Sequence, residues 1–465
     1  MVALCLHILL ATNPNMETTT RTSLKEPPKL FSLRNAAHSW THGRDNHNNN
    51  NNPQKQHVSP RTLSRRQEYE QKYPPTDKAR IRDFVQSLRN GTLDEQHTAL
   101  SQSSLLPYDI MDCPDVPPPE YPVHFPLLQV LEEWPVDVLQ WPTNQNHPQP
   151  HFLHHSLCIF DWTRPEHRTR IMAYQAKYDV PFLVRNHDEI LQATERWMRH
   201  DPAYLASLIE EPQRTEHSTS NHLPFWRLPK GKQKHAKHNG NNEYKDWKPP
   251  TENIQMTFRE WYDKAVAMDE AIANGQDHTN LDHYYFRLNG DPFQRNTYLY
   301  EELPMFDPDL SLPGENVFMW EPDEARGINC RLGMAGNIAE AHYDAGRNWI
   351  LLVGGGQRRY ILGHPRQCPN LALYPVGHPS ARHSAPNWSD IGKNGDNGSD
   401  GLSEAAQALA HAEVTQVVLQ ASDALFLPTH WFHFIVSLNR NYQCNARSGS
   451  TSTYAKYITD CGFPV

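Results

Sequence analysis

The sequence lacks three features, each of which would have pointed to a particular class of protein. It has no excess of basic residues, because 44 Lys and Arg stand against 53 Asp and Glu, for a formal net charge of −9. Such an acidic chain has no global electrostatic attraction to nucleic acid or to an anionic membrane. It has no Cys-x-x-Cys pair, which argues against zinc-knuckle and thioredoxin-type sites. It also shows no fixed-period repeat, which argues against a solenoid or a propeller.

Long apolar runs are missing as well. The run that opens the chain, MVALCLHILLA, is shorter than the ~20 residues that a membrane-spanning helix needs. It could be the apolar part of a secretory signal, although it has no basic leader. Glycosylation tripeptides at Asn90, Asn387 and Asn397 would fit that alternative. The seven cysteines are odd in number and widely spaced, which favours free thiols in a reducing compartment. We therefore expect a soluble intracellular protein, with a secretory or endomembrane location as the alternative.

The chain divides into three predicted parts. Residues 1–75 are expected to be a disordered, low-complexity region with the targeting alternative at 1–11, because its Asn-rich, polar composition cannot offset the entropy lost on ordering. Residues 76–180 are expected to be a helical and coil extension that packs on the core. Residues 181–465 form the main domain. Helices are predicted over IRDFVQSLRNG, LLQVLEEW, ILQATERWM and TFREWYDKAVAMDEAIANG, and the polar stretch 213–253 is predicted to be loop or coil.

Short strands dominate from Tyr284 to Asn445. Many short strands separated by Gly, Pro and Asp turns indicate a sandwich or barrel, so the fold class is mainly β with flanking helices. The predicted strands are HYYFRL, NTYLYEEL, NVFMWE, INCRLGM, IAEAHYD, NWILLVGG, RRYILG, VTQVVLQ, ALFLP, FHFIVSL and YQCNARSG. One helix, SEAAQALAHAEV, interrupts them.

A His-x-Asp pair lies on one of these strands. Side chains at i and i+2 of a strand face the same way, so His342 and Asp344 are expected to point together. An imidazole and a carboxylate from one strand, completed by a ligand from another, form the facial triad of non-haem iron(II) oxygenases. Two other short-range His-acid pairs, at His187 and His411, fall at predicted helix ends, where the side chains diverge. A surface strand pair with ordinary hydrogen bonds remains the alternative for His342 and Asp344.

The third ligand is expected from SDALFLPTHWFHFIVSL. His433 lies in an apolar strand, which would place its imidazole inside the barrel wall. His430 follows the Pro turn directly and is expected at the rim. A core histidine bonded to a backbone carbonyl is the alternative role for His433.

Several of these segments resemble the JmjC/cupin-like oxygenases (cupin_8 type), and within them the asparaginyl-hydroxylase type. The resemblance is carried by GMAGNIAEAHYDAGRNWILLVGGGQRRYILGHP, LYPVGHP and SDALFLPTHWFHFIVSL, and it extends over about 180–447. It implies a double-stranded β-helix, also called a jelly roll or cupin fold.

The resemblance also implies a set of site residues. It makes His342, Asp344 and His433 the ligands of Fe(II), with 2-oxoglutarate as co-substrate and dioxygen as the oxidant. Arg358, or Arg359 if the pattern is one residue longer, would pair with the distal carboxylate of 2-oxoglutarate. The remaining residues implied at the co-substrate pocket are Asn348, Tyr298 and Asn445. One departure from the family pattern is Ala339, which stands where a hydroxyl donor is usual.

The expected function is an Fe(II)- and 2-oxoglutarate-dependent hydroxylase, with a protein or peptide as the favoured substrate. The alternatives are a non-catalytic, metal-binding cupin-like module and a histone-type demethylase. There is no nucleic-acid signature, since the Lys- and His-rich stretch 230–247 is more simply a solvated loop. The sequence does not fix the oligomeric state.

Overall fold

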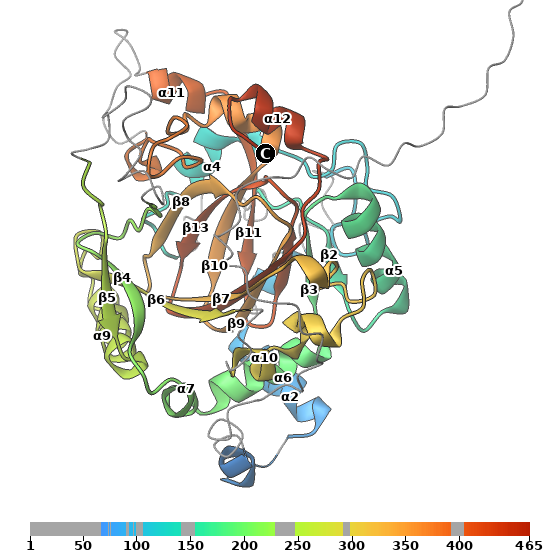
Figure 1. The fold of residues 1–465 in the computed structure, drawn as a ribbon, viewed down its shortest axis with the longest axis vertical. Coiled ribbons are helices and arrows are strands. Elements are labelled where there is room, and N and C mark those ends of the chain that lie inside the picture. The colour runs from blue at the N-terminus through green and yellow to red at the C-terminus, as the bar shows by residue number, and fades with distance from the viewer. Residues whose placement is uncertain are drawn as a thin grey trace, which may run out of the picture. The chain divides into compact units, whose positions relative to one another are not determined.

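Two β-sheets face each other in the computed structural model (Figure 1). The structure describes residues 67–140 with short gaps, and then 154–227, 247–291, 298–391 and 404–465. All of them belong to one unit, residues 55–465. Residues 1–66, which were predicted to be disordered, lie outside the described residues, and so does most of the stretch 230–247.

The shorter sheet has five strands in the order β1-β11-β10-β13-β8. These strands are β1 (Phe125–Pro126), β11 (Glu413–Leu419), β10 (Arg358–Gly363), β13 (Phe432–Ser437) and β8 (Ile338–Tyr343). All of its described pairings are antiparallel. β8 is therefore an edge strand, which matters for the site described below.

The longer sheet has nine strands in the order β2-β3-β12-β9-β14-β7-β6-β4-β5. Its first part contains β2 (Ile159–Asp161), β3 (Phe182–Arg185), β12 (Ala424–Leu427), β9 (Asn348–Gly355) and β14 (Asn441–Ser448). It continues with β7 (Ala325–Gly333), β6 (His283–Gly290), β4 (Gln213–Ser218) and β5 (Glu252–Met256). The two facing sheets confirm the expected mainly-β jelly roll.

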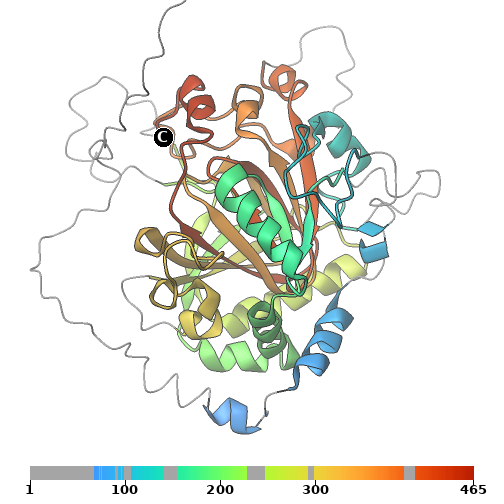
Figure 2. The same ribbon diagram turned by 90° about the vertical axis from the view of Figure 1, so that its right-hand side faces the viewer.

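Helices cover the outer faces of both sheets (Figures 1 and 2). Those near the longer sheet are α2 (Lys78–Leu88), α5 (Pro165–Ala173), α6 (Asp188–Arg199), α7 (Ala203–Leu208), α9 (Phe258–Ala273) and α10 (Leu299–Glu302). Those near the shorter sheet are α4 (Leu127–Glu133), α11 (Glu404–Leu409) and α12 (Ala455–Asp460). The predicted cap of α9 is present, because the Thr257 hydroxyl accepts from Glu260 N–H while the Glu260 carboxylate accepts from Thr257 N–H.

Two apolar clusters hold these layers together. The larger contains inward side chains of both sheets together with Trp197 of α6 and Trp261 of α9, both fully buried. The smaller joins the outer face of the five-stranded sheet to α4, α11 and α12. Helix α6 lies so close to β9 that a Cβ at Gly354 would overlap the sulfur of Met198. Successive side chains along a strand of the shorter sheet point alternately into the larger cluster, inside the barrel, and into the smaller cluster outside it.

Four local expectations are wrong. The segment NTYLYEEL forms helix α10 rather than a strand, and NVFMWE forms turns. The polar stretch 213–253 contributes strand β4 and the start of β5, because pairing with β6 overrides its composition. Residues 67–72, placed in the disordered region, are helical. Tyr69 of that helix packs on Tyr204 with ring centroids 4.2 Å apart, a tertiary contact that composition does not reveal.

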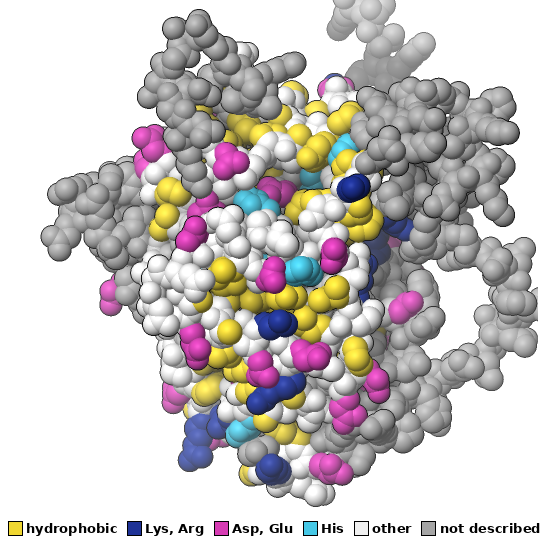
Figure 3. All heavy atoms as spheres, turned by 90° about the vertical axis from the view of Figure 1, so that its left-hand side faces the viewer, with side chains coloured by type: hydrophobic (Ala, Val, Ile, Leu, Met, Phe, Trp, Pro, Cys, Tyr) yellow, Lys and Arg dark blue, Asp and Glu magenta, His cyan; other side chains and the backbone are white. Residues whose placement is uncertain are grey.

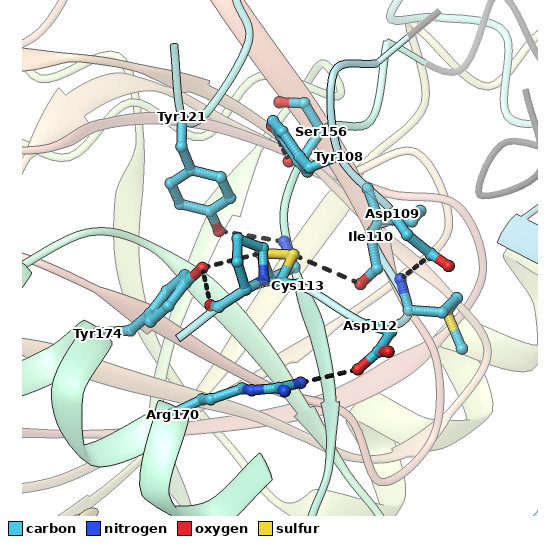
Figure 4. Close-up of a disulfide and its surroundings, with 12 residues drawn as sticks. Tyr108, Asp109, Ile110, Asp112, Cys113, Tyr121, Ser156, Arg170 and Tyr174 are labelled. Atoms are coloured by element: carbon cyan, nitrogen blue, oxygen red, sulfur yellow. Dashed lines mark hydrogen bonds and ion pairs between the residues drawn. A yellow bond between two sulfur atoms is a disulfide. The ribbon is translucent and has the colours of Figure 1, made fainter. Parts of the chain in front are cut away.

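The expectation of free thiols is also wrong for the six cysteines that the structure describes. They form the disulfides Cys113–Cys158, Cys330–Cys444 and Cys368–Cys461. Tyr121 and Tyr174 lie beside the first disulfide (Figure 4). The Tyr174 hydroxyl donates a hydrogen bond to the carbonyl of Pro114 at 2.9 Å. Residues 330 and 444 are 114 positions apart but directly opposite on β7 and β14, so spacing alone could not reveal the pair. Because disulfides persist in oxidising compartments, this pairing favours the secretory alternative.

A buried ion-pair cluster ties the N-terminal extension to the barrel. Asp423, which is fully buried, accepts from Arg89 at 2.9 Å and from Arg185 at 3.1 Å. Arg185 also pairs with Asp94 at 3.1 Å. The extension that begins with α2 therefore packs on the core through charges as well as through apolar contacts.

The face that includes β4, β5 and α9 carries acidic and basic side chains interspersed with apolar ones (Figure 3). Within the ranges that the structure describes, no helix is both long and apolar enough to cross a membrane.

Candidate metal and co-substrate site

Backbone register brings the two predicted histidine ligands together. β13 pairs with β8 so that His433 lies opposite His342, and their ring centroids are 4.2 Å apart. The register shifts between this pair and the next, Ile435 with Ala339, which marks a bulge in β8. Ala339 lies opposite Ile435, so its methyl group faces the barrel interior.

Both imidazoles are held in one tautomer. Nδ1 of His342 lies 2.7 Å from the carbonyl oxygen of Glu340, and Nδ1 of His433 lies 3.1 Å from that of Trp431. A carbonyl can only accept, so each Nδ1 carries the hydrogen and each Nε2 keeps a lone pair. Burial lowers the pKa of both imidazoles, which keeps them neutral, as metal ligation requires.

Asp344 follows β8 directly and is held by two hydrogen-bond donors. Arg447 forms an ion pair with its Oδ1 at 2.9 Å, and Asn348 donates to its Oδ2 at 3.0 Å. Burial alone would raise the pKa of this carboxyl group, but the guanidinium of Arg447, the largest of the opposing interactions, helps to hold the pKa below its usual range. The carboxylate is therefore charged.

A chain of hydrogen bonds leads from Asp344 to Arg358. Asn445 donates to Asn348 at 2.9 Å, and Gln443 donates to Asn445 at 3.4 Å. Arg358 then donates to Gln443 at 2.8 Å. Asn348, Asn445 and Arg358, three residues predicted for the co-substrate pocket, thus lie on one connected polar path.

The register of β10 decides between Arg358 and Arg359. Arg358 is on the face of Tyr360 and Leu362, and Leu362 lies opposite His433, so the guanidinium of Arg358 faces the barrel interior. Arg359 points the other way. It donates to the carbonyl of Trp134 at 2.7 Å and stacks over the Trp134 ring at 4.1 Å. Arg358 is therefore the arginine on the metal-site side of the sheet.

The phenol beside Arg358 is Tyr285 of β6, not Tyr298. Arg358 donates to the Tyr285 hydroxyl and lies 5.4 Å from its ring centroid. Tyr298 lies at the start of α10, where burial raises the pKa of its hydroxyl and Glu302 adds to the shift. The expectation for Tyr298 relied on a strand that does not form.

His430 lies on the other side of β8 from the paired histidines. Its ring packs edge-on against Tyr343, with centroids 5.5 Å apart, and its backbone N–H donates to the carbonyl of Asp344 at 2.9 Å. The other His-acid pairs lie at helix ends, as expected: His187 is the N-cap of α6, and His411 follows the end of α11.

The donor set fits Fe(II) in its chemistry. Two neutral imidazoles with anchored Nδ1–H groups and one charged carboxylate match the ligands that non-haem iron takes. Among the residues that the structure describes, however, no three His, Cys, Asp or Glu side chains already enclose a metal position. Oδ1 of Asp344 is instead directed at Arg447. His342 and Asp344 are partly exposed, which leaves this side of the site open.

Four residues near the site were not predicted. Gln443 and Arg447 precede and follow Asn445 by two positions on β14, so the two-residue period of a strand could have identified them. Tyr285 could not be separated from Tyr284 without the register of β6. His383 lies in the segment 371–391 between β10 and α11, and nothing in the sequence indicates that this segment returns to β8.

The fold and the site together define a jelly-roll domain with two inward imidazoles and an acidic side chain at one edge of the barrel. Residues 169–448, more than half of the chain, match the family described as the Cupin-like domain. The chain belongs to this family, and the resemblance to the JmjC/cupin-like oxygenases is confirmed.

Curated relatives support the family but differ in what their names describe. The chain is 29% identical over 142 residues to the lysine-specific demethylase JMJ31 of Arabidopsis thaliana, covering 28% of this chain and 24% of the relative. It is 25% identical over 155 residues to the tRNA wybutosine-synthesizing protein 5 of Gallus gallus, covering 33% and 42%. It is 28% identical over 140 residues to the Jumonji C domain-containing protein 5 of Drosophila melanogaster, covering 30% and 32%. The match spans less than half the length of each relative.

Proposed function

We propose that this chain is an Fe(II)- and 2-oxoglutarate-dependent oxygenase that hydroxylates a protein or peptide substrate. The observation that carries the proposal is the shared inward face of His433 and Arg358. His433 lies on β13 and Arg358 on the neighbouring strand β10, where Leu362 is the residue opposite His433. Leu362 is four positions from Arg358, so the two ends of the site are about 13 Å apart along β10. An arginine side chain and a five-carbon diacid together can span that distance.

In this proposal His342, His433 and Asp344 hold the iron, which supplies the oxidising chemistry when dioxygen and the keto acid are bound. Arg358 and Tyr285 bind the distal carboxylate of 2-oxoglutarate, Arg358 through charge and hydrogen bonds together. The hydroxyl of Tyr360 is buried and lacks a protein partner, so it offers a further donor on the same face. Asn348 and Asn445 keep Asp344 oriented. The protein's share of the chemistry is to position these groups and to keep water out.

A protein substrate is supported by aromatic rings in and beside the segments that cover the edge of β8. Residues 221–223 pair with the start of β8, where Leu223 N–H donates to the Ile338 carbonyl at 2.9 Å. The half-buried ring of Trp226 lies 5.9 Å from that of Trp247, which in turn lies 5.6 Å from His378. Aromatic side chains are enriched where proteins bind one another.

The test is turnover by anaerobically purified protein supplied with Fe(II). We expect succinate and carbon dioxide release that depends on both iron and 2-oxoglutarate, and that is lost in His342→Ala. Candidate substrates should then gain one oxygen atom in mass spectra. Tight, stoichiometric zinc with no effect of the keto acid would instead establish the non-catalytic metal-binding module.

The histone-type demethylase remains a rival, since one relative's name describes a lysine demethylase. Release of formaldehyde from methylated peptides, with no stable oxygenated product, would favour it over the hydroxylase.

A further inference from the structure

One guanidinium group inside the barrel has no carboxylate partner. Arg331 of β7 lies directly opposite Arg287 of β6 on one side and Gln443 of β14 on the other. Residues directly opposite in a sheet share a face, and Gln443 accepts from Arg358 inside the barrel, so Arg331 faces the interior as well. Among the described residues, the Arg331 side chain makes one hydrogen bond, a donation to the carbonyl of Cys330 at 3.1 Å. No ion pair therefore compensates its charge in this part of the chain.

The neighbouring interior arginines differ from Arg331 in this respect. Arg287 forms an ion pair with Glu216 of β4. The proposed function assigns the distal carboxylate of 2-oxoglutarate to Arg358. Each of these two arginines then has an anion, and Arg331, which lies between them, is left without one.

The position is unfavourable for a positive charge that stays without an anion. Like charges directly opposite each other on neighbouring strands destabilise a sheet. Burial lowers the pKa of Arg331 to about 9, and the charge of Arg287 adds to that shift. Arg287 is only 6% exposed, and its Nε makes no hydrogen bond within the described structure. A carboxylate held between the two guanidinium groups would remove the repulsion and satisfy this buried donor.

The two opposed arginines lie next to the aromatic residues that cover the edge of β8. The guanidinium carbon of Arg287 is 5.7 Å from the centroid of the Phe225 ring. Phe225 stacks on His383 with centroids 6.1 Å apart, and His383 stacks on the proposed ligand His342 at 4.8 Å. A group that enters the barrel beside Phe225 therefore meets Arg287 and Arg331 close to the proposed metal site.

We propose that Arg331, together with Nε of Arg287, binds a carboxylate of the substrate, so that this chain selects an acidic protein or peptide. The inference rests on the proposed function and names the chemical class of its substrate. An Asp or Glu side chain and a free C-terminus present the same two oxygens, and a guanidinium can bind either through two hydrogen bonds. Arg331 is thus a specificity-determining residue rather than a ligand of the iron or of 2-oxoglutarate.

The test compares fluorescent peptide pools that differ at one central position. One pool has Glu there and the other has Gln, both are blocked at their two ends, and the random positions exclude Asp and Glu. Fluorescence anisotropy measures binding to the full chain loaded with Co(II) and saturated with 2-oxoglutarate. The Glu pool should bind about 10-fold or more tightly than the Gln pool, since charge-assisted hydrogen bonds contribute at least that factor. A Gln pool with a free C-terminus that binds as tightly as the Glu pool would assign the carboxylate to a chain end.

Variants of Arg331 connect this preference to one side chain. Arg331→Gln should abolish the difference between the pools, and Arg331→Lys, which keeps the charge, should restore part of it. Neither should change the dissociation constant for 2-oxoglutarate in calorimetric titrations. The urea midpoint of Arg331→Gln should equal or exceed that of the unaltered protein, because an uncompensated charge is removed. Arg331→Met is the second neutral variant in case the first fails to fold.

Arg259→Gln is the matched control, because it removes one exposed positive charge from α9. It should keep the preference for the Glu pool. Equal binding of all pools by the unaltered protein, or binding of none, would overturn the role of Arg331. Weaker 2-oxoglutarate binding by Arg331→Gln with no preference for acidic peptides would place Arg331 in the co-substrate site, which also overturns the inference but leaves the proposed function intact. Failure of the unaltered protein to bind 2-oxoglutarate would count against the proposed function, and with it against this inference.

Discussion

Nδ2 of Asn348 lies 3.0 Å from Oδ2 of Asp344 and donates a hydrogen bond to it. The same side chain accepts from Asn445 at 2.9 Å, so Asn348 connects the proposed metal ligand to the co-substrate side of the barrel. This relationship makes a first prediction possible, because partners that orient a ligating carboxylate contribute to metal affinity without touching the metal.

Asn348→Ala should weaken metal binding about 10-fold or more, since Asp344 then keeps only Arg447 to orient it. Calorimetric titration of the metal-free protein with Co(II) measures the change. The exposed Asn280→Ala is the control and should bind Co(II) as the unaltered protein does. Equal affinities in all three proteins would mean that Asn348 does not position Asp344.

Arg358 and Arg359 form a natural matched pair for the co-substrate. Arg358→Gln should raise the KM for 2-oxoglutarate about 10- to 100-fold, because a charge-assisted hydrogen bond contributes about 1.5–3 kcal/mol. Arg359→Gln should leave that KM unchanged and lower the free energy of unfolding by about 1–3 kcal/mol, because the Trp134 carbonyl loses its donor. Initial rates over a range of 2-oxoglutarate concentrations, together with urea unfolding, distinguish the two. The reverse pattern would assign the co-substrate role to Arg359.

Neutralising the buried carboxylate of Asp423 should destabilise the protein strongly. Its carboxylate is fully buried between Arg89 and Arg185, so Asp423→Asn leaves two buried guanidinium groups poorly compensated and should cost about 3–5 kcal/mol. Asp188 pairs with Lys78 at 2.8 Å on the surface, and Asp188→Asn should cost about 0–1 kcal/mol. Urea unfolding monitored by Trp fluorescence compares them. Similar losses for the two variants would contradict the buried-pair interpretation.

Reduction should destabilise the protein. Peptide mapping without reductant is expected to show Cys113–Cys158, Cys330–Cys444 and Cys368–Cys461 as linked peptides. The double variant Cys330→Ser/Cys444→Ser should lose about 2–4 kcal/mol, because the disulfide no longer restricts the unfolded chain. Titration of six or more free thiols in the native protein would show that the cysteines are unpaired and would restore the reducing-compartment expectation.

Stability should decline on acidification because of buried neutral histidines away from the metal site. Burial lowers the pKa of His155 to about 4, outweighing its bond to the Gln416 carbonyl. The unfolded chain binds a proton near the ordinary pKa of about 6.5, so this contribution is present above that pH and is lost as the pH falls toward 4. His155→Gln should therefore lose less stability between about pH 7.5 and about pH 5 than the unaltered protein.

The sequence alone determined the elements whose patterns are local. The short strand segments that form β8, β9, β10, β13 and β14 and the capped helix α9 are recognisable from neighbouring residues, and all of them form as predicted. The sequence also identified His342 and Asp344 as a candidate pair, because side chains two positions apart on a strand point to the same face. His433 needed the family resemblance as well, and its place opposite His342 agrees with it.

The tertiary structure decided which side chains from different strands lie next to one another. Register alone turned Arg358 inward and Arg359 outward, and it placed Tyr285 beside Arg358 where Tyr298 had been expected. It paired cysteines 114 residues apart and carried His383 back to His342. These contacts join segments that are far apart in the chain, so no local sequence pattern predicts which residues meet. Strand pairing and burial determine the partners only when the whole barrel forms.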